Sequence, residues 1–174
     1  TRVLLPAKQV PQEVKIGDVL KVFLYKDSKD RLIATTNTPK LQLEQLAVLE
    51  VLEIGKIGAF LDWGLEKDLF LPFKEMTRKV EPGDEILVTL YIDKSRRLCA
   101  TMKGIYDLLS KESPYKEGDT VQGRVYEFSD NFGTFIAVDD RYSAMIPRHE
   151  DCSFLRIGDI IAVSYTHLRA HETL

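Results

Sequence analysis

The chain has 174 residues, of which 44% are hydrophobic and 29% are charged, a composition that is typical of folded globular proteins and excludes a disordered chain. Its formal net charge of -3 argues against a protein that holds nucleic acid mainly by bulk electrostatic attraction. No apolar run approaches the roughly 18 residues that span a bilayer, and Cys99 and Cys152 are too few and too far apart to indicate a disulfide framework or a zinc knuckle. We therefore expect a cytoplasmic protein with no membrane partner.

Internal repetition is the strongest organising signal in the chain. Leu5-Pro6 recurs 66 positions later as Leu71-Pro72, and a partial third copy follows the second at an offset of 75. The repetition predicts several copies of one folding unit, of which the first and the last are incomplete. The other pairs at the first offset are Lys8 and Lys74, Gly17-Asp18 and Gly83-Asp84, Tyr25 and Tyr91, Asp27 and Asp93, Arg31 and Arg97, and Ala34-Thr35 and Ala100-Thr101.

Residues 1–38 are expected to form the C-terminal half of the first unit. By comparison with the second copy, this half supplies three strands, at residues 2–5, 19–25 and 32–36. The strands that would complete its sheet are expected upstream of Thr1.

Residues 43–103 form the complete copy. Five short apolar segments are predicted to be strands, with a basic connection between the third and the fourth and a Pro-Gly turn before the fourth. Short antiparallel strands with such a connection are typical of a small closed Greek-key barrel. The predicted fold class is therefore all-β, with tandem five-stranded antiparallel barrels and incomplete terminal units. The five strands are predicted at residues 48–54, 58–63, 68–71, 86–92 and 97–101.

The remaining chain is predicted to hold a linker and a third copy. Residues 104–116 form the linker, with a short helix at 104–113 that ends before Pro114, and residues 117–163 form the N-terminal part of a third unit. Residues 164–174, with the sequence S-Y-T-H-L-R-A-H-E-T-L, break the repeat and resemble a peptide translated from adapter sequence. We expect this tail to be non-native.

Two phenylalanines of the complete copy lie on the polar side of their predicted strands. Alternation at period two places Phe60 on the side of Gly58 and Asp62, with Trp63 on the opposite, buried side, and it places Phe70 on the polar side of the next strand. Aromatic rings on the open face of a small sheet are a platform on which bases stack. The alternative is that each ring is a surface or interface hydrophobe.

The motifs around these rings resemble those of the S1 RNA-binding domain. Gly58-Ala59-Phe60, Leu69-Phe70-Leu71-Pro72 and the hairpin Asp93-x-x-x-Arg97 stand at the places of the family's motifs. The resemblance implies an OB-fold barrel with an RNA face, on which Phe70 replaces a histidine and Ile57 an aromatic residue. The candidate RNA-binding residues are Phe60, Phe70, Asp93 and Arg97, the nearby Lys56 and Lys74, Phe132 and Phe135 of the third copy, and Asp27 and Arg31 of the first copy.

Two of these assignments have structural alternatives. Asp93 and Arg97 would also suit an ion pair that stabilises the hairpin. The basic run that begins at Lys74 is also typical of a solvated loop.

Over residues 1–163 the tandem units also resemble the bacterial virulence-factor-B family. The resemblance is carried by L-P-x-K after the third strand and by the hairpins Y-K-D-S-K-D-R-L-I-A-T-T and Y-I-D-K-S-R-R-L-C-A-T-M. It implies a cytoplasmic regulator that binds RNA through several S1 units followed by a winged-helix domain. We expect non-catalytic binding of single-stranded RNA by a post-transcriptional or virulence-type regulator. The alternatives are a protein-interaction module, or an accessory domain that contacts ribosomal or RNA-processing proteins.

Enzymatic interpretations have little support in the sequence. His149-Glu150-Asp151-Cys152 contains residue types that bind metals, but adjacent residues of an extended segment point to opposite sides, so a surface loop is favoured. The sequence has no Gly-rich phosphate loop or nucleophile motif. We expect no catalytic activity, cofactor or metal.

Overall fold

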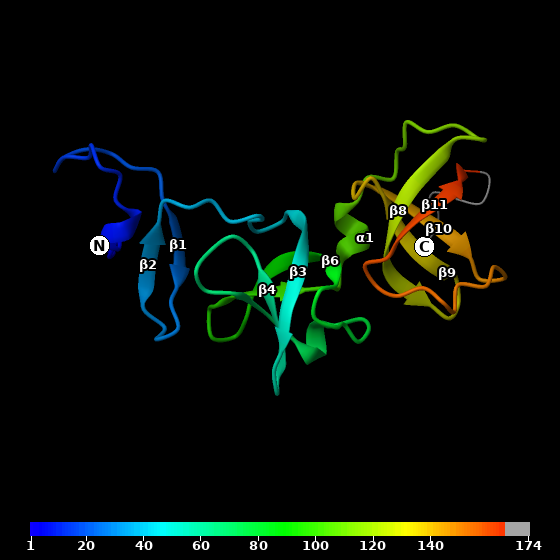
Figure 1. Ribbon diagram of the computed structural model, residues 1–174, viewed down its shortest axis with the longest axis horizontal. Helices are drawn as coiled ribbons and strands as arrows, with labels where there is room; N and C mark the ends of the chain where they lie inside the picture. Colours follow the sequence, from blue (N-terminus) through cyan, green and yellow to red (C-terminus); the bar gives the residue numbers. More distant parts are fainter. Residues whose placement is uncertain (166–174) are drawn as a thin grey trace.

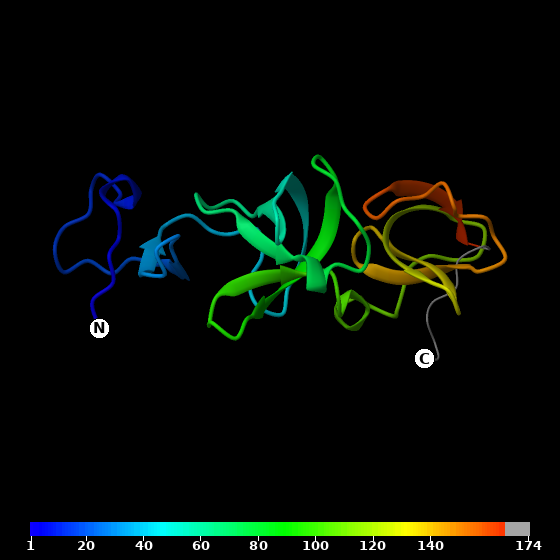
Figure 2. The same ribbon diagram turned by 90° about the horizontal axis from the view of Figure 1, so that it is seen from below.

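The computed structural model describes residues 1–165, and these residues are almost entirely β-structure (Figure 1). Three sheets follow one another along the long axis of the molecule, and both views in Figures 1 and 2 keep them separate. Helical structure in the described residues is limited to α1 (Ile105–Leu108) and the 3-10 turns η1 (Ala7–Gln9) and η2 (Phe73–Glu75). The predicted all-β class is confirmed.

The central unit is a five-stranded antiparallel sheet in the order β5-β4-β3-β6-β7. Strand β5 also approaches β7, so the sheet closes into a barrel, as the repeat pattern predicts. Each strand lies within two residues of its predicted bounds. The strands are β3 (Leu46–Ile54), β4 (Gly58–Asp62), β5 (Leu69–Pro72), β6 (Glu85–Ile92) and β7 (Leu98–Thr101).

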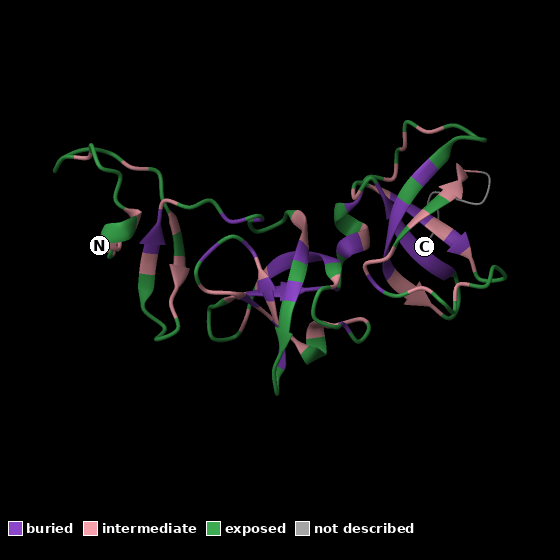
Figure 3. Ribbon diagram, viewed as in Figure 1, coloured by how far each residue is buried: buried purple, intermediate pink, exposed green. Residues whose placement is uncertain are grey.

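The barrel interior is filled by the side chains on the apolar side of each alternating strand. Leu61, Leu69 and Leu71 are fully buried, and Trp63 is buried beside them, as its position in the alternation predicts. Figure 3 shows buried and exposed positions alternating along the strands. The indole N–H of Trp63 donates to the carbonyl oxygen of Lys67 at 2.6 Å, which satisfies its polar group in the core.

The third unit repeats the strand order of the first four strands of the barrel, as β10-β9-β8-β11. Its strands are β8 (Thr120–Ser129), β9 (Gly133–Val138), β10 (Tyr142–Pro147) and β11 (Ile160–Ser164). Ser164 pairs with Thr120, so β11 extends one residue into the segment 164–174. The rest of that predicted tail, from residue 166, lies outside the described residues.

The first unit contains less strand than expected. Only the hairpin of β1 (Phe23–Lys26) and β2 (Leu32–Thr35) is regular. The strand predicted at residues 2–5 is reduced to one bridge between Leu4 and Ile33, and residues 19–22 are not a strand. Within the described residues these segments have no neighbouring strand with which to form a ladder of hydrogen bonds, so they do not become regular strands.

The linker helix is also shorter than predicted. It has four residues and begins after Gly104, whose φ of 76° would be unfavourable for a residue with a side chain. Leu109 is extended, and the backbone of Ser110 bonds to Arg141 and Ser143 at 2.9 Å each. This pairing with the third unit ends the helix five residues before the predicted boundary.

The central and third units pack directly on each other. Arg124 of β8 is only 8% exposed and donates to the carbonyl oxygens of Glu85 and Gly158, each at 3.1 Å. Arg156 forms ion pairs with Asp84 at 3.0 Å and with Glu81 at 3.2 Å. The exact boundaries between the units stay predictions.

Candidate nucleic-acid interface

Phe60 and Phe70 lie directly opposite each other on the outer face of the central barrel. They are partners in the β4–β5 register, their ring centroids are 5.5 Å apart, and the rings are inclined at 42°. Both side chains are half-buried, while Leu61 and Leu69 beside them point into the core. The barrel therefore presents two adjoining rings with accessible surface.

Gly58 is the residue that allows this arrangement. A Cβ atom at this position would lie 2.7 Å from the ring of Phe70 and 2.3 Å from the carbonyl oxygen of Leu71. Both distances are below van der Waals contact, so any side chain would displace the ring or the strand. This steric demand explains the glycine of the Gly58-Ala59-Phe60 motif.

The two rings line a cleft of about 480 Å³. Asp93, Arg97 and Cys99 of the β6–β7 hairpin line it too, as do Tyr25, Lys26 and Ser28 of the β1–β2 hairpin. A second hollow of about 360 Å³ shares Ile57, Phe70 and Asp93 with the cleft and reaches Lys74 and Tyr91. Because the cleft and the hollow share these lining residues, they adjoin on the barrel face, and together they are called the groove below.

Asp93 organises its hairpin through the backbone. One of its carboxylate oxygens accepts the N–H groups of Ser95 and Arg97, both at 2.9 Å. Burial acts to raise the pKa of Asp93, but these two hydrogen bonds, together with that from the Cys99 thiol and the charge of Arg97, outweigh it and hold the pKa below its usual value. Asp93 is therefore an anion that fixes the turn.

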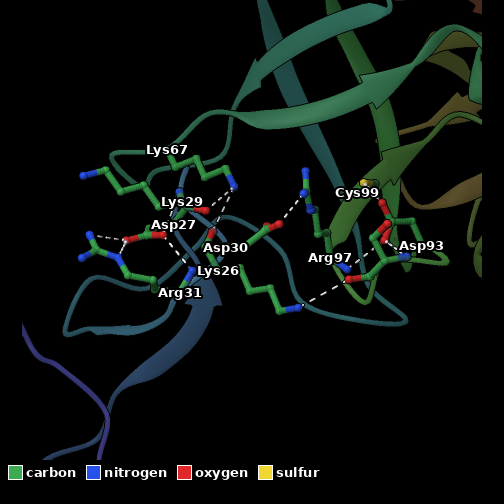
Figure 4. A network of polar contacts seen from close by, with 10 residues as sticks. Lys26, Asp27, Lys29, Asp30, Arg31, Lys67, Asp93, Arg97 and Cys99 are labelled. Carbon is green, nitrogen blue, oxygen red and sulfur yellow. Dashed lines mark hydrogen bonds and ion pairs between the residues drawn. The ribbon is translucent and has the colours of Figure 1, made fainter.

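The guanidinium of Arg97 reaches Asp30 of the first unit, at 2.5 Å, and not Asp93 (Figure 4). The sequence-based alternative of an Asp93–Arg97 ion pair is therefore wrong for this hairpin. In the first unit the corresponding ion pair does form. Two guanidinium nitrogens of Arg31 lie 2.9 and 3.0 Å from one carboxylate oxygen of Asp27. Asp27 and Arg31 are engaged with each other and do not line the cleft.

The third-unit residues are divided between surface and interior. Phe132 lies in the turn before β9 and is 44% exposed. Phe135 is only 5% exposed and packs against Tyr126 at 6.0 Å, in a cluster that includes Leu87 of β6 and Ile105 and Leu109 of the linker. The face of β9 that corresponds to the Phe60 face of β4 is thus covered by the central unit. Phe135 cannot stack on a base in this arrangement, so its predicted role is corrected to interface packing.

The two predicted lysines are both exposed but differ in position. Lys74 lines the groove beyond Phe70, whereas Lys56 lies in the β3–β4 turn outside the lining residues. The structure adds Tyr25, Lys26 and Tyr91, which were not predicted. The 66-residue repeat that pairs Tyr25 with Tyr91 was the signal that could have identified two of them.

The described residues offer no competing chemical centre. Within residues 1–165 no group of three or more His, Cys, Asp and Glu side chains is arranged to hold a metal ion. His149 lies 3.8 Å from Glu150 with an exposed side chain, which agrees with a surface loop. Across the same residues, no helix has the length and apolar character that crossing a membrane requires.

These features define a barrel protein with an aromatic groove, and comparison places it in a family. The S1 domain family matches residues 1–37 and 45–103, and the chain belongs to that family. It is similar to Conserved virulence factor B of Staphylococcus aureus, with 23% identity over 159 residues in strains bovine RF122 / ET3-1 and MRSA252, covering 87% of this chain and 53% of each relative. The chain spans about half the length of these curated relatives.

A solved structure confirms the fold. The crystal structure of a multidomain protein with nucleic acid binding domains from Streptococcus pneumoniae TIGR4 matches with a TM-score of 0.68 at 22% identity. The match covers 93% of this chain and 59% of that protein. The fold of this chain is therefore shared with an experimentally determined structure.

Proposed function

We propose that the chain binds single-stranded RNA in the groove over Phe60 and Phe70 and catalyses no reaction. The observation that carries this proposal is the half-exposed pair of rings, 5.5 Å apart, on the outer face of an S1 barrel. Stacking on such rings contributes about 1 to 3 kcal/mol per base and tolerates any base, because every base has a π-face. We expect little sequence preference, and a preference for unpaired RNA, whose bases are free to stack.

The charges around the groove suit a ligand that combines bases with phosphates. Lys74 and Arg97 of the central unit supply cations at its edge, although the whole chain carries a net charge of -3. Burial, followed by the charges of Asp62 and Glu53, raises the pKa of Asp68, which also lines the groove. Phosphate contacts would therefore be local and few.

The biological context is a further part of this proposal. The name Conserved virulence factor B, carried by the Staphylococcus aureus relatives, and the nucleic acid binding domains of the Streptococcus pneumoniae protein support a cytoplasmic bacterial regulator that acts after transcription. A rival function is a protein-interaction module, which the exposed apolar side chains of Ile57 and Phe73 in the groove lining would favour.

We expect a fluorescent single-stranded RNA to bind with an affinity that falls as salt rises. For single strands the slope of log affinity against log salt is about -0.7 per phosphate contact, so three contacts give about -2. Fluorescence anisotropy at several salt concentrations measures this slope, with duplex RNA as the comparison. An absence of binding, or equal binding of the duplex, would refute the proposal. Binding of a protein with an affinity that does not change with salt would instead support the protein-interaction module.

We expect Asp30→Asn to tighten RNA binding a few-fold at low salt. The substitution removes the carboxylate that pairs with Arg97, so the guanidinium becomes available to phosphate and a repulsive charge is lost. The gain should disappear at high salt because screening removes it. Glu13→Gln is the control, since Glu13 is exposed, makes the same charge change and does not line the groove. Equal affinities of the two variants would show that Arg97 does not meet phosphate.

A further inference from the structure

We infer that the β1–β2 hairpin of the first unit is part of the same binding site, so that RNA is held jointly by Tyr25 and Lys26 of the first unit and by Phe60 and Phe70 of the central barrel. This inference rests on the proposed function and adds a second structural unit to the site. It turns two repeated units into one binding surface.

The first observation is the composition of the cleft. Tyr25, Lys26 and Ser28 line it together with Phe60, Phe70 and Arg97, although the two groups belong to different units. Tyr25 is half-buried and adds a third aromatic ring to the pair on β4 and β5. A ligand that stacks on Phe60 therefore lies within the cleft that the hairpin helps to enclose.

The second observation is that several independent contacts fix the hairpin on the barrel. Phe23 packs edge-on against Trp63, with ring centroids 5.9 Å apart. The ammonium group of Lys67 donates to the carbonyl oxygens of Lys26 and Asp27 at 3.0 and 3.1 Å (Figure 4). Aromatic packing and polar contacts act together, so the hairpin forms a fixed side of the cleft.

The chemistry of the hairpin residues suits nucleic acid. The ammonium of Lys26 makes one long contact, 3.4 Å to the carbonyl oxygen of Ser95, and an ammonium group has three donors, so it has donors left for a phosphate. Burial, followed by the charges of Glu66 and Asp27, raises the pKa of Tyr25, so its ring stays neutral beside a phosphate backbone. Stacking needs only the ring, which Tyr25→Phe keeps.

The test compares two double variants of the full chain in the RNA titration. Tyr25→Ala with Lys26→Ala should weaken binding about tenfold or more, whereas Tyr25→Phe should change it less than twofold. The matched control is Leu24→Ala with Lys21→Ala, which makes the same charge change, with one position in strand β1 and one just before it. Both positions are exposed and do not line the cleft. Equal affinity of the two double variants would overturn the inference while leaving the proposed function intact.

Photocrosslinking of the unaltered chain avoids any effect of substitution on folding. An RNA that contains 4-thiouridine should crosslink both to the segment with Tyr25 and Lys26 and to the segment with Phe60 and Phe70. Crosslinks confined to the barrel segments would overturn the inference. Crosslinks to neither segment would count against the proposed function itself, which makes the two failures distinguishable.

Discussion

The double variant Phe60→Ala, Phe70→Ala is expected to bind single-stranded RNA at least about 30-fold more weakly than the original chain. Each lost stacking contact is worth about 1 to 3 kcal/mol, so two contacts amount to at least about 2 kcal/mol, and 1.4 kcal/mol corresponds to a factor of ten. Both rings lie on the outer face of the barrel with Leu61 and Leu69 behind them, so the core keeps its packing. Fluorescence anisotropy gives the affinity, and circular dichroism checks the fold.

The control for this experiment is Phe154→Ala. Phe154 is 74% exposed, lies in the third unit and does not line the groove, so it removes an aromatic side chain without touching the site. We expect its RNA affinity to stay within twofold of the original. If the double variant also kept its affinity and its fold, the proposed face would be wrong.

Phe135→Ala is expected to destabilise the protein by about 3 to 5 kcal/mol, as is usual when a buried phenylalanine is truncated. The 5% exposed ring packs between the third unit and the central unit, against Leu87 and the linker residue Ile105. Its removal leaves a cavity in this interface and weakens the contact between the units. Urea unfolding followed by intrinsic fluorescence measures the loss.

Phe132→Ala is the matched comparison, because Phe132 lies three residues earlier and is 44% exposed. Its effect on stability should stay below about 1 kcal/mol, as is common for exposed positions. Phe135→Ala should not weaken RNA binding where the protein remains folded. A stable Phe135→Ala variant that bound RNA poorly would show that Phe135 faces the ligand and that the interface is described wrongly.

Phe60 and Phe135 show that alternation in the sequence predicts which side of a strand a residue occupies, but not whether that side is exposed. Both occupy the same position of the repeat, and alternation places both on the face away from the barrel interior. Alternation does not predict what covers that face. Phe60 lines an open groove, whereas Phe135 is covered by the central unit. Leu87 was the available signal, because it is an apolar residue on the outer side of the predicted strand and it packs in the same cluster.

The central barrel could be predicted because its information is local. Alternation along each strand and the turn at Gly83 act within about ten residues of chain, and the repeat shows the same pattern in a second copy. Together they locate every strand of the barrel. Pairing over long distances could not be predicted in this way. The partner of Arg97 is Asp30, 67 residues away, and the linker helix ends early because Ser110 joins the third unit.

Nuclear magnetic resonance mapping of the labelled chain with a short oligouridine tests the binding face most directly. We predict that shifts of the backbone amides concentrate in β4, in β5 and in the β6–β7 hairpin that carries Asp93 and Arg97, with β9 and β10 unchanged. Shifts concentrated in β9 and β10, or no saturable shifts at all, would contradict RNA binding on the Phe60 and Phe70 face.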